Sequence, residues 1–175
     1  MAAPGAVVLR SDVERKARFG FSETERLPEE AYAPDVTAAV YAALGDKARR
    51  VVAAGHSVIV DAVYAQPHER AAIAATANGA SFIGLFLAAD MATRLARVGD
   101  RRGDASDADA AVARAQEDYD LADLEWTPLD ASGTPAQTLA QAKAVLNRLL
   151  AERASVQGCR RGAAPPDSAG GQPSS

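Results

Sequence analysis

Disulfides, membrane helices and secretion signals are all missing from this sequence of 175 residues. Cys159 is the single cysteine, so no disulfide can form within the chain. No apolar run approaches the roughly 18 residues that a membrane-spanning helix needs. The N-terminus also lacks a basic region followed by an apolar signal core. We therefore expect a cytoplasmic protein.

Aromatic residues are scarce and the net charge is small. Only 5% of the residues are aromatic, whereas 48% are hydrophobic and many of those are alanine. This composition is typical of helices packed closely on a sheet, and the length corresponds to about one domain. The 23 acidic and 19 basic residues give a net charge of −4. Because that charge provides no general attraction to nucleic acids or anionic membranes, we expect neither as a partner.

Three common catalytic motifs are absent from the sequence. His56 and His68 are the only histidines, and the segment HERAA lacks the second histidine of a zinc-binding helix. No G-x-S-x-G motif occurs, which disfavours a serine hydrolase of that type. No G-x-G-x-x-G motif follows a predicted strand, which disfavours a dinucleotide-binding enzyme.

The sequence does contain an alternation of short apolar strands and longer amphipathic helices. Strands are predicted at residues 5–9, 57–61, 82–87 and 127–130. Helices are predicted at 11–20, 35–54, 66–79, from 90 onwards, after the polar break that begins at 103, and at 135–153. This alternation predicts an α/β fold with a parallel sheet. The composition predicts one domain over 1–154 and a disordered tail over 155–175.

Acidic residues follow three of the predicted strands: Asp12, Asp61 and Asp130. Ligand-binding residues of parallel sheets lie just beyond the carboxyl ends of the strands, so these three are candidates for a site. The alternative is that each is a turn or cap residue, because aspartate is common in both places. Asp12, or Ser11 before it, would then be the N-cap of the first helix.

Four segments of the chain resemble one specific family. They are VVLRSDVERK, AGHSVIVDAVYAQPHER, ATRLARVGDRRGDASDADA and WTPLDASG. Together they resemble the P-loop kinase-like domain of the bacterial AAA family ATPase type, which is often fused C-terminal to an aminoglycoside-phosphotransferase-like domain. The resemblance runs from about Gly5 to Leu150. It implies a P-loop NTPase fold of the nucleoside-kinase type, with ATP and Mg²⁺ as cofactors and a small hydroxylated molecule as phosphoryl acceptor.

The phosphate-binding loop of that family is missing here. The pattern G-x-x-x-x-G-K-[ST] offers backbone amides and a lysine to the phosphates of ATP, and this sequence has no Gly-Lys pair. Because the sheet order of this kinase fold is 2-3-1-4-5, we expect the chain to begin at the second strand and to lack the central one. The strands at 5–9 and 57–61 would then form one pair and those at 82–87 and 127–130 a separate pair. Binding of ATP would be impaired.

The resemblance also implies roles for residues near the first two strands. Asp12 would contact the acceptor hydroxyl or take its proton. Arg15, one helical turn later, would hold an anionic group of the substrate. Asp61 would hold the Mg²⁺ shell as a catalytic and metal-binding carboxylate. The alternative for Arg15 is a solvated arginine, and Glu69 and Arg70 are expected to form surface ion pairs.

Two arginines of the predicted helix after residue 90 are further candidates. Arg97 and Arg101 share one helical face and would stabilise charge on the transferred phosphoryl group. The alternative is a solvated basic face that pairs with nearby acids, among them Asp107. In the kinase interpretation, Ser106 or Asp107 caps the next helix.

The loop after the last predicted strand is the third candidate region. In the resembling kinases this loop lies against the adenine base, so the resemblance implies that Asp130, Ser132 and Gly133 bind the cofactor. The alternative is an ordinary strand-to-helix turn, which an Asp-x-Ser-Gly segment forms equally well.

Other functions stay open on the sequence alone. The chain is alternatively a non-catalytic fragment or interaction module, or the product of a gene start placed too late in an intact kinase or ATPase. A G-x-x-x-x-G-K-[ST] pattern in frame upstream of Met1 would indicate a late gene start. A nucleotide hydrolase without an acceptor is a further alternative, which phosphate release without a phosphorylated product would indicate.

Overall fold

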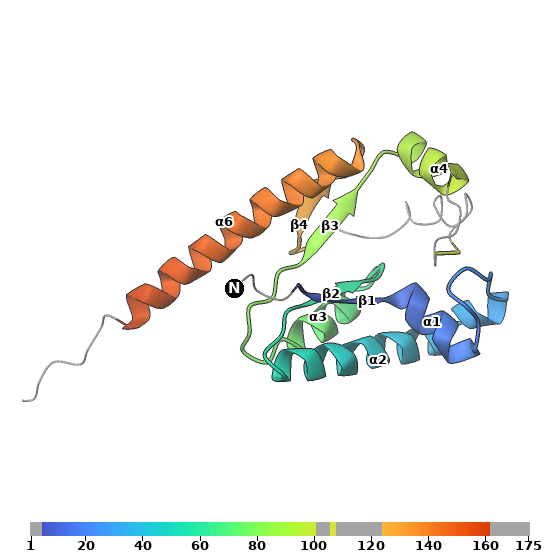
Figure 1. Cartoon of the computed structure of the whole chain (residues 1–175), viewed down its shortest axis with the longest axis horizontal. Coiled ribbons are helices and arrows are strands. Elements are labelled where there is room, and N and C mark those ends of the chain that lie inside the picture. The colour runs from blue at the N-terminus through green and yellow to red at the C-terminus, as the bar shows by residue number, and fades with distance from the viewer. Residues whose placement is uncertain (1–4, 101–105, 108–123, 162–175) are drawn as a thin grey trace, which may run out of the picture. The chain divides into compact units, whose positions relative to one another are not determined.

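A computed structural model of the chain describes residues 5–100, 106–107 and 124–161 (Figure 1). In chain order its elements are β1 (Val7–Arg10), α1 (Ser11–Phe19), the 3₁₀ helix η1 (Glu29–Tyr32), α2 (Pro34–Ala53), β2 (Val58–Asp61), α3 (Pro67–Ala75), β3 (Leu85–Ala88), α4 (Met91–Asp100), β4 (Thr127–Asp130) and α6 (Pro135–Arg161). The chain forms two compact units, Met1–Ser132 and Gly133–Ser175, and α6 is the helix of the second. The predicted α/β class is confirmed.

The strands of the first unit form two parallel pairs. β1 pairs with β2 in a register that begins at Val7↔Val58, and β3 pairs with β4 in a register that begins at Leu85↔Thr127. Among the described residues, each pair is a sheet of its own, as the predicted pairings require (Figure 1). β3 begins three residues later than the strand predicted at 82–87, since it starts at Leu85.

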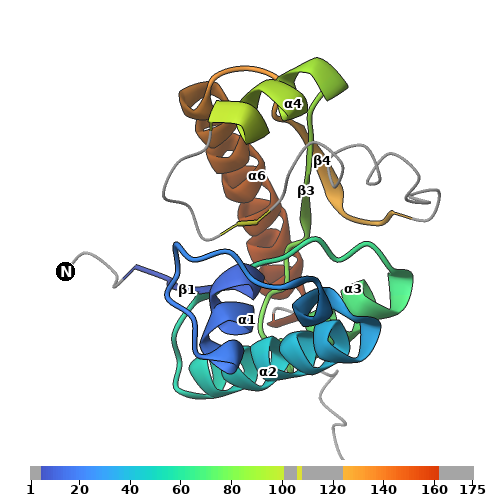
Figure 2. The same cartoon turned by 90° about the vertical axis from the view of Figure 1, so that its right-hand side faces the viewer.

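Helix α2 packs on both β1 and β2 and supplies much of the core (Figure 2). Its residues Val40, Leu44 and Ala48 are fully buried. Ala48 packs with Tyr64 and Ile73 at the centre of the core. Partly buried residues that pack around these three are Leu9, Tyr41, Val58, Val60, Ala62, Phe82 and Trp126. The core thus joins β1, β2, α2 and α3 to the segments that flank β3 and β4.

The other face of the β1–β2 pair is exposed in the described structure. Val8 and Ile59 are partners in the register, so their side chains lie on the same face. They are 58% and 56% exposed. The apolar run at 57–61 predicts burial on both faces, and that prediction is wrong for Ile59, because α2 covers only the face of Val58 and Val60.

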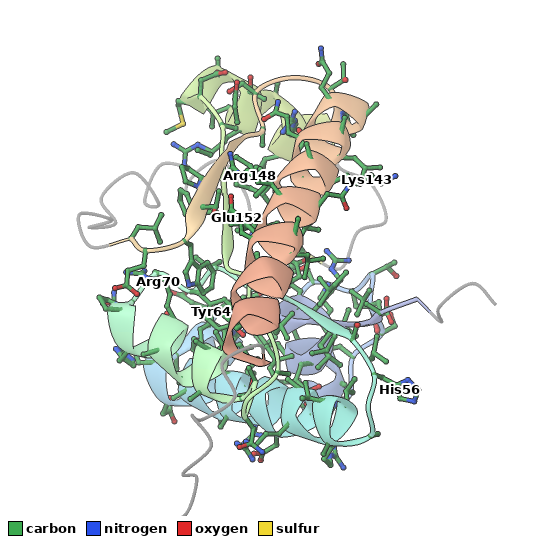
Figure 3. The ribbon with its side chains drawn as sticks, turned by 90° about the vertical axis from the view of Figure 1, so that its left-hand side faces the viewer. His56, Tyr64, Arg70, Lys143, Arg148 and Glu152 are labelled. Atoms are coloured by element: carbon green, nitrogen blue, oxygen red, sulfur yellow. The ribbon has the colours of Figure 1, made fainter. Side chains whose placement is uncertain are left out.

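The described part of the second unit contains α6 and the residues that cap it. Thr134 N–H donates to Gln137 Oε1 at 2.8 Å, and Gln137 N–H donates to Thr134 Oγ1 at 3.3 Å, which is the reciprocal pattern of a capping box. The helix continues to Arg161, so it extends into the predicted tail at 155–175. Arg148 and Glu152, one turn apart on α6, lie 3.9 Å from each other (Figure 3).

Length alone does not make α6 a membrane helix. Neither it nor any other helix in the described ranges combines the length and the apolar character that crossing a membrane requires.

Candidate functional site

The carboxyl ends of β1 and β2 bring together Asp12 and Asp61, two of the predicted site residues. Arg10 and Asp61 are partners in the parallel register and end their strands. Arg10 Nε donates to Asp61 Oδ2 at 3.3 Å, and the Asp61 side chain is 62% exposed. Asp12 follows β1 and lies close enough to Asp61 for their charges to interact. The two carboxylates therefore share one edge of the sheet.

Asp12 is not the N-cap of α1. The helix begins at Ser11, and its N-cap is Arg10, which makes no side-chain capping bond. The predicted cap at Ser11 or Asp12 is wrong, because helical backbone geometry already starts at Ser11. Asp12 lies in the first turn, where a negative charge interacts favourably with the N-terminal end of the helix dipole. Capping therefore does not account for an aspartate at this position.

The surroundings of Asp12 make its carboxylate a stronger base. Burial raises the pKa of Asp12 above its ordinary value, and the negative charge of Asp61 raises it further. The charges of Arg10 and Arg15 and a hydrogen bond from Ser106 lower the pKa, but burial outweighs them. A carboxylate of raised pKa is better matched to proton transfer near neutral pH. Asp12 is therefore suited to bind a hydroxyl group and accept its proton.

Arg15 is buried, so the alternative of a solvated arginine is wrong. The residue is 5% exposed, and its Nη1 donates to the backbone oxygen of Ala31 at 2.6 Å and to Thr37 Oγ1 at 3.2 Å. The guanidinium lies 5.0 Å from the centre of the Tyr32 ring, a cation–π distance. Arg15 Nε has no hydrogen-bond partner among the described residues. Arg15 thus holds η1 and α2 against α1, and its contact with a substrate stays a prediction.

A buried ion pair that the sequence did not reveal lies beside Arg15. The Lys16 side chain is 1% exposed, and its Nζ donates to Asp107 Oδ1 at 3.0 Å and to the backbone oxygen of Glu23 at 2.9 Å. Asp107 Oδ2 accepts hydrogen bonds from Leu27 N–H at 2.9 Å and from the Tyr32 hydroxyl at 2.6 Å. Asp107 therefore binds α1, η1 and the loop between them, whereas the alternative interpretation of the basic face paired it with nearby arginines.

The hydrogen bonds of this cluster shift the pKa of both acidic groups. Burial tends to raise the pKa of Asp107, but the bonds from Tyr32, Leu27 and Lys16 outweigh burial and lower it. Burial and the bond to Asp107 raise the pKa of Tyr32. Asp107 is thus ionised and Tyr32 neutral at physiological pH. No local pattern marks Lys16 as buried, because its partner lies 91 residues away in the chain.

The ends of β3 and β4 form a hydrogen-bonded turn. Ser132 N–H donates to Asp130 Oδ1 at 2.9 Å, and Asp90 N–H donates to Ser132 Oγ at 3.1 Å. The bonds from Ser132 lower the pKa of Asp130. The turn alternative therefore describes the local structure of this loop. Contact of Asp130, Ser132 and Gly133 with an adenine base stays a prediction.

Helix α4 contains one of the two predicted phosphoryl-binding arginines. Asp90, just before α4, accepts hydrogen bonds at 2.8 Å from both the N–H and the hydroxyl of Thr93. These bonds lower the pKa of Asp90 and stabilise the first turn of the helix. Arg97 lies in the last turn of α4, and Arg101 lies outside the described residues. The predicted role of their shared face is therefore not tested.

Arg70 is buried as well, so the predicted surface ion pair of Glu69 and Arg70 is wrong (Figure 3). Arg70 Nη1 donates to the backbone oxygens of Tyr64 at 3.0 Å and Ala65 at 2.8 Å. Glu69 instead accepts from Gln66 N–H at 2.9 Å and closes the capping box of α3. Tyr64 has a φ of 45°, which bulky residues rarely adopt. Arg70 thus fixes the strained loop that follows Asp61.

The two carboxylates are not part of a larger metal-ligating cluster in the described part of the chain, and the groove described below lies away from them. Within the described ranges, no group of three or more His, Cys, Asp or Glu residues could hold a metal ion. An open groove of about 380 Å³ lies between β1 and the C-terminal half of α2. It is lined by Val7, Leu9, Lys47, Arg50, Val51, Ala54 and His56. These residues lie toward the amino end of β1, so the groove is distinct from the edge that carries Asp12.

Comparison with known proteins places this geometry in a family. The chain is similar to the crystal structure of a gluconokinase from Sinorhizobium meliloti 1021, with a TM-score of 0.58 and 21% identity over 87% of this chain and 83% of the other. At that identity the likeness shows the fold alone. No curated protein matches the chain. The AAA domain family matches residues 1–120, well over half of the sequence. The chain therefore belongs to the AAA domain family.

Proposed function

We propose that the chain forms the acceptor side of a P-loop kinase that transfers a phosphoryl group from ATP to a hydroxyl of a small molecule. The observation that carries this proposal is Asp12, a half-buried carboxyl of raised pKa at the carboxyl end of β1. Membership of the AAA domain family and likeness to the fold of a gluconokinase support the reaction class. A fold alone does not establish an activity, so the site residues carry the argument.

In this proposal Asp12 orients the acceptor hydroxyl and accepts its proton. Arg10 holds the Asp61 carboxylate beside it through the ion pair at the strand ends. Arg15 binds an anionic group of the acceptor through Nε, whereas its Nη1 is already engaged by Ala31 and Thr37. Each of these groups acts on the acceptor side of the reaction.

The remaining residues of the proposal concern the cofactor side. Arg97 and Arg101 stabilise the charge of the transferred group, and Asp61 is the carboxylate for Mg²⁺. The residues Asp130, Ser132 and Gly133 line the base.

The residues that the structure describes do not supply a site for a triphosphate. The sequence has no Gly-Lys pair. In the described ranges, Asp61 does not belong to a group of three or more residues that could hold a metal ion. Mg²⁺ usually binds one or two carboxylates together with substrate phosphates, which need their own cradle of backbone amides. We therefore propose that the phosphate-binding loop comes from polypeptide beyond the 175 residues, either upstream in the same gene product or in a second chain.

A non-catalytic interaction module is the second candidate function. The exposed Val8 and Ile59 on one face of the β1–β2 pair favour it, because apolar surface of this kind often marks a contact with another protein segment. A module of this kind would bind its partner equally well when Asp12 is replaced by asparagine.

The decisive experiment compares the 175-residue chain with a chain extended by the codons in frame upstream of Met1. Mg-ATP binding is measured by calorimetry, and phosphorylated product is sought with gluconate, other sugar acids, polyols and aminoglycosides. We expect product from the extended chain only. Micromolar binding of Mg-ATP by the 175-residue chain would refute the proposed impairment, and phosphate release without product would indicate a hydrolase.

Replacement of the proposed base supplies the residue-level test. In the active form, Asp12→Asn should lower the rate by about 10²–10⁴-fold, the usual contribution of a general base. Asp46→Asn is the matched control, because Asp46 is exposed and pairs with Arg49 on the surface of α2. An Asp12→Asn variant that retains the full rate would contradict the proposed function.

A further inference from the structure

Ser106 and Asp107 lie between α4 and β4 in the chain but bind elements from its first third. Asp107 Oδ1 accepts from Lys16 in α1, and Oδ2 accepts from Leu27 N–H and from Tyr32 in η1. The Asp107 side chain is only 10% exposed. Because three donors from separate parts of the fold converge on one buried carboxylate, its position and orientation are fixed.

Fixing Asp107 also fixes its neighbour Ser106. Adjacent Cα atoms are about 3.8 Å apart, so a residue next to an anchored one has little freedom to move away. Ser106 donates a hydrogen bond to the Asp12 carboxylate. Asp107 thus holds the Ser106 hydroxyl in place against the proposed proton acceptor.

Stability alone gives a poor account of this arrangement. Burying a lysine and an aspartate together usually adds little net stability, because desolvation offsets their attraction, and apolar residues of similar size are often as good. Buried polar groups that fix a geometry are better explained by the group that they place. Here the group in reach is Asp12, through Ser106.

We propose that Asp107 and Ser106 are positioning residues, which hold one oxygen of Asp12 so that the other oxygen faces the acceptor hydroxyl. A carboxylate offers about four lone-pair sites on two oxygens, so one bond from a serine leaves room for a second alcohol. Only the purpose of this positioning rests on the proposed function. The coupling of Asp107, Ser106 and Asp12 is a property of the chain itself.

The test is an NMR titration of the Asp12 carboxyl carbon in the 175-residue chain. Ser106→Ala should raise the pKa of Asp12, because it removes a hydrogen bond to the ionised form. Asp107→Ala should also raise it, and the double variant should raise it no further than either single one. Arg10, Asp61 and Arg15, whose charges also act on Asp12, are present in every variant.

The sign of the change with Asp107→Ala separates positioning from plain electrostatics. Loss of the negative charge of Asp107, with Lys16 left unneutralised, would by itself lower the pKa of Asp12. A rise therefore requires that the bond from Ser106 has been lost. A fall in the pKa of Asp12 with Asp107→Ala would overturn the inference. An unchanged pKa with Ser106→Ala would overturn it as well.

Two further variants guard against unfolding and against general effects. Tyr32→Phe removes one donor to Asp107 without changing any charge, and should raise the pKa of Asp12 in the same direction but by less. Asp46→Ala, on the exposed side of α2, should leave it unchanged. The proposed function fails separately, if Asp12→Asn leaves phosphorylation by the extended chain intact.

Discussion

Replacing Asp107 and replacing Lys16, the two residues of the buried ion pair, should lower the free energy of unfolding by different amounts. The Lys16 side chain is 1% exposed, and after Asp107→Ala its ammonium keeps the hydrogen bond to the backbone oxygen of Glu23 at 2.9 Å. An uncompensated buried charge typically costs about 3–5 kcal/mol. We expect the free energy of unfolding to fall by about that amount, which is a large share of the total for a small domain.

The opposite replacement should be milder because Asp107 keeps other donors. After Lys16→Met, the carboxylate still accepts hydrogen bonds from Leu27 N–H and the Tyr32 hydroxyl. The main loss is the hydrogen bond between the charged groups of Lys16 and Asp107, worth about 1.5–3 kcal/mol, and the bond from Lys16 to the Glu23 backbone oxygen is lost as well. In the double variant neither charge is left unpaired, so its cost should fall below the sum of the single costs by more than about 1 kcal/mol.

Urea unfolding followed by circular dichroism measures these differences, with Arg49→Met as a surface control. Arg49 pairs with Asp46 on the exposed face of α2, so its loss should cost about 0.5 kcal/mol or less. The reasoning is refuted if Asp107→Ala costs less than about 1 kcal/mol, or if the double variant is simply additive.

Acid should abolish the contribution of Asp107. Burial raises its pKa, but hydrogen bonds from Tyr32, Leu27 and Lys16 outweigh burial, so the folded-state pKa lies below the ordinary value. A carboxyl of lowered pKa stabilises the fold at any pH above its ordinary pKa of about 3.9. That stabilisation is lost as the pH falls through the lowered folded-state pKa, so the difference between wild type and Asp107→Ala should shrink there.

Three other expectations concern separate parts of the first unit. Asp12→Asn should raise the free energy of unfolding at pH 7, because burial raises the pKa of Asp12 and its ionised form therefore opposes folding. The gain should vanish below the ordinary carboxyl pKa, which urea unfolding at several pH values will test. Gly84→Ala should cost about 1–3 kcal/mol, because its Cβ would overlap the Trp126 ring, and the emission of this single tryptophan should shift to the red. Arg70→Met should cost about 1–3 kcal/mol in urea, since it leaves two loop carbonyls without their donor; a value as small as that of Arg49→Met would contradict the buried role.

The strand pairings could be predicted from the sequence, and several side-chain environments could not. Short apolar runs and the family resemblance together predicted which strands pair, and both pairs form in parallel. Ile59 was predicted to be buried because its run is apolar throughout, yet exposure depends on what covers each face. The length of α6 was underestimated because the end of the helix was predicted from composition only. A helix that is already formed adds further residues at little cost, even where they do not favour a helix strongly.

The candidate site shows the same division. Asp12 and Asp61 were found because parallel strands bring their carboxyl ends to one edge, which is a rule of topology. Lys16 and Arg70 were missed because a charged side chain is buried only when tertiary partners satisfy it, and their local sequence resembles a solvated helix face. Proximity in sequence suggested nearby arginines as one alternative set of partners for Asp107, whereas the bonds described for it come from residues distant in the chain.

The carboxylates at the two strand-end edges have pKa values shifted in opposite directions. This difference bears on which edge carries the proposed proton transfer. At the β3–β4 edge, hydrogen bonds from Thr93 and Ser132 lower the pKa of Asp90 and Asp130, so ionisation of both groups favours the fold. At the β1–β2 edge, burial raises the pKa of Asp12, so its ionisation opposes the fold. A carboxylate whose ionisation opposes folding is kept where its basicity is useful. An asparagine in the same turn would avoid that loss of stability. The proposed acceptor chemistry therefore belongs to the β1–β2 edge, whereas the hydrogen-bonded turn at the β3–β4 edge holds the residues that are proposed to bind the base.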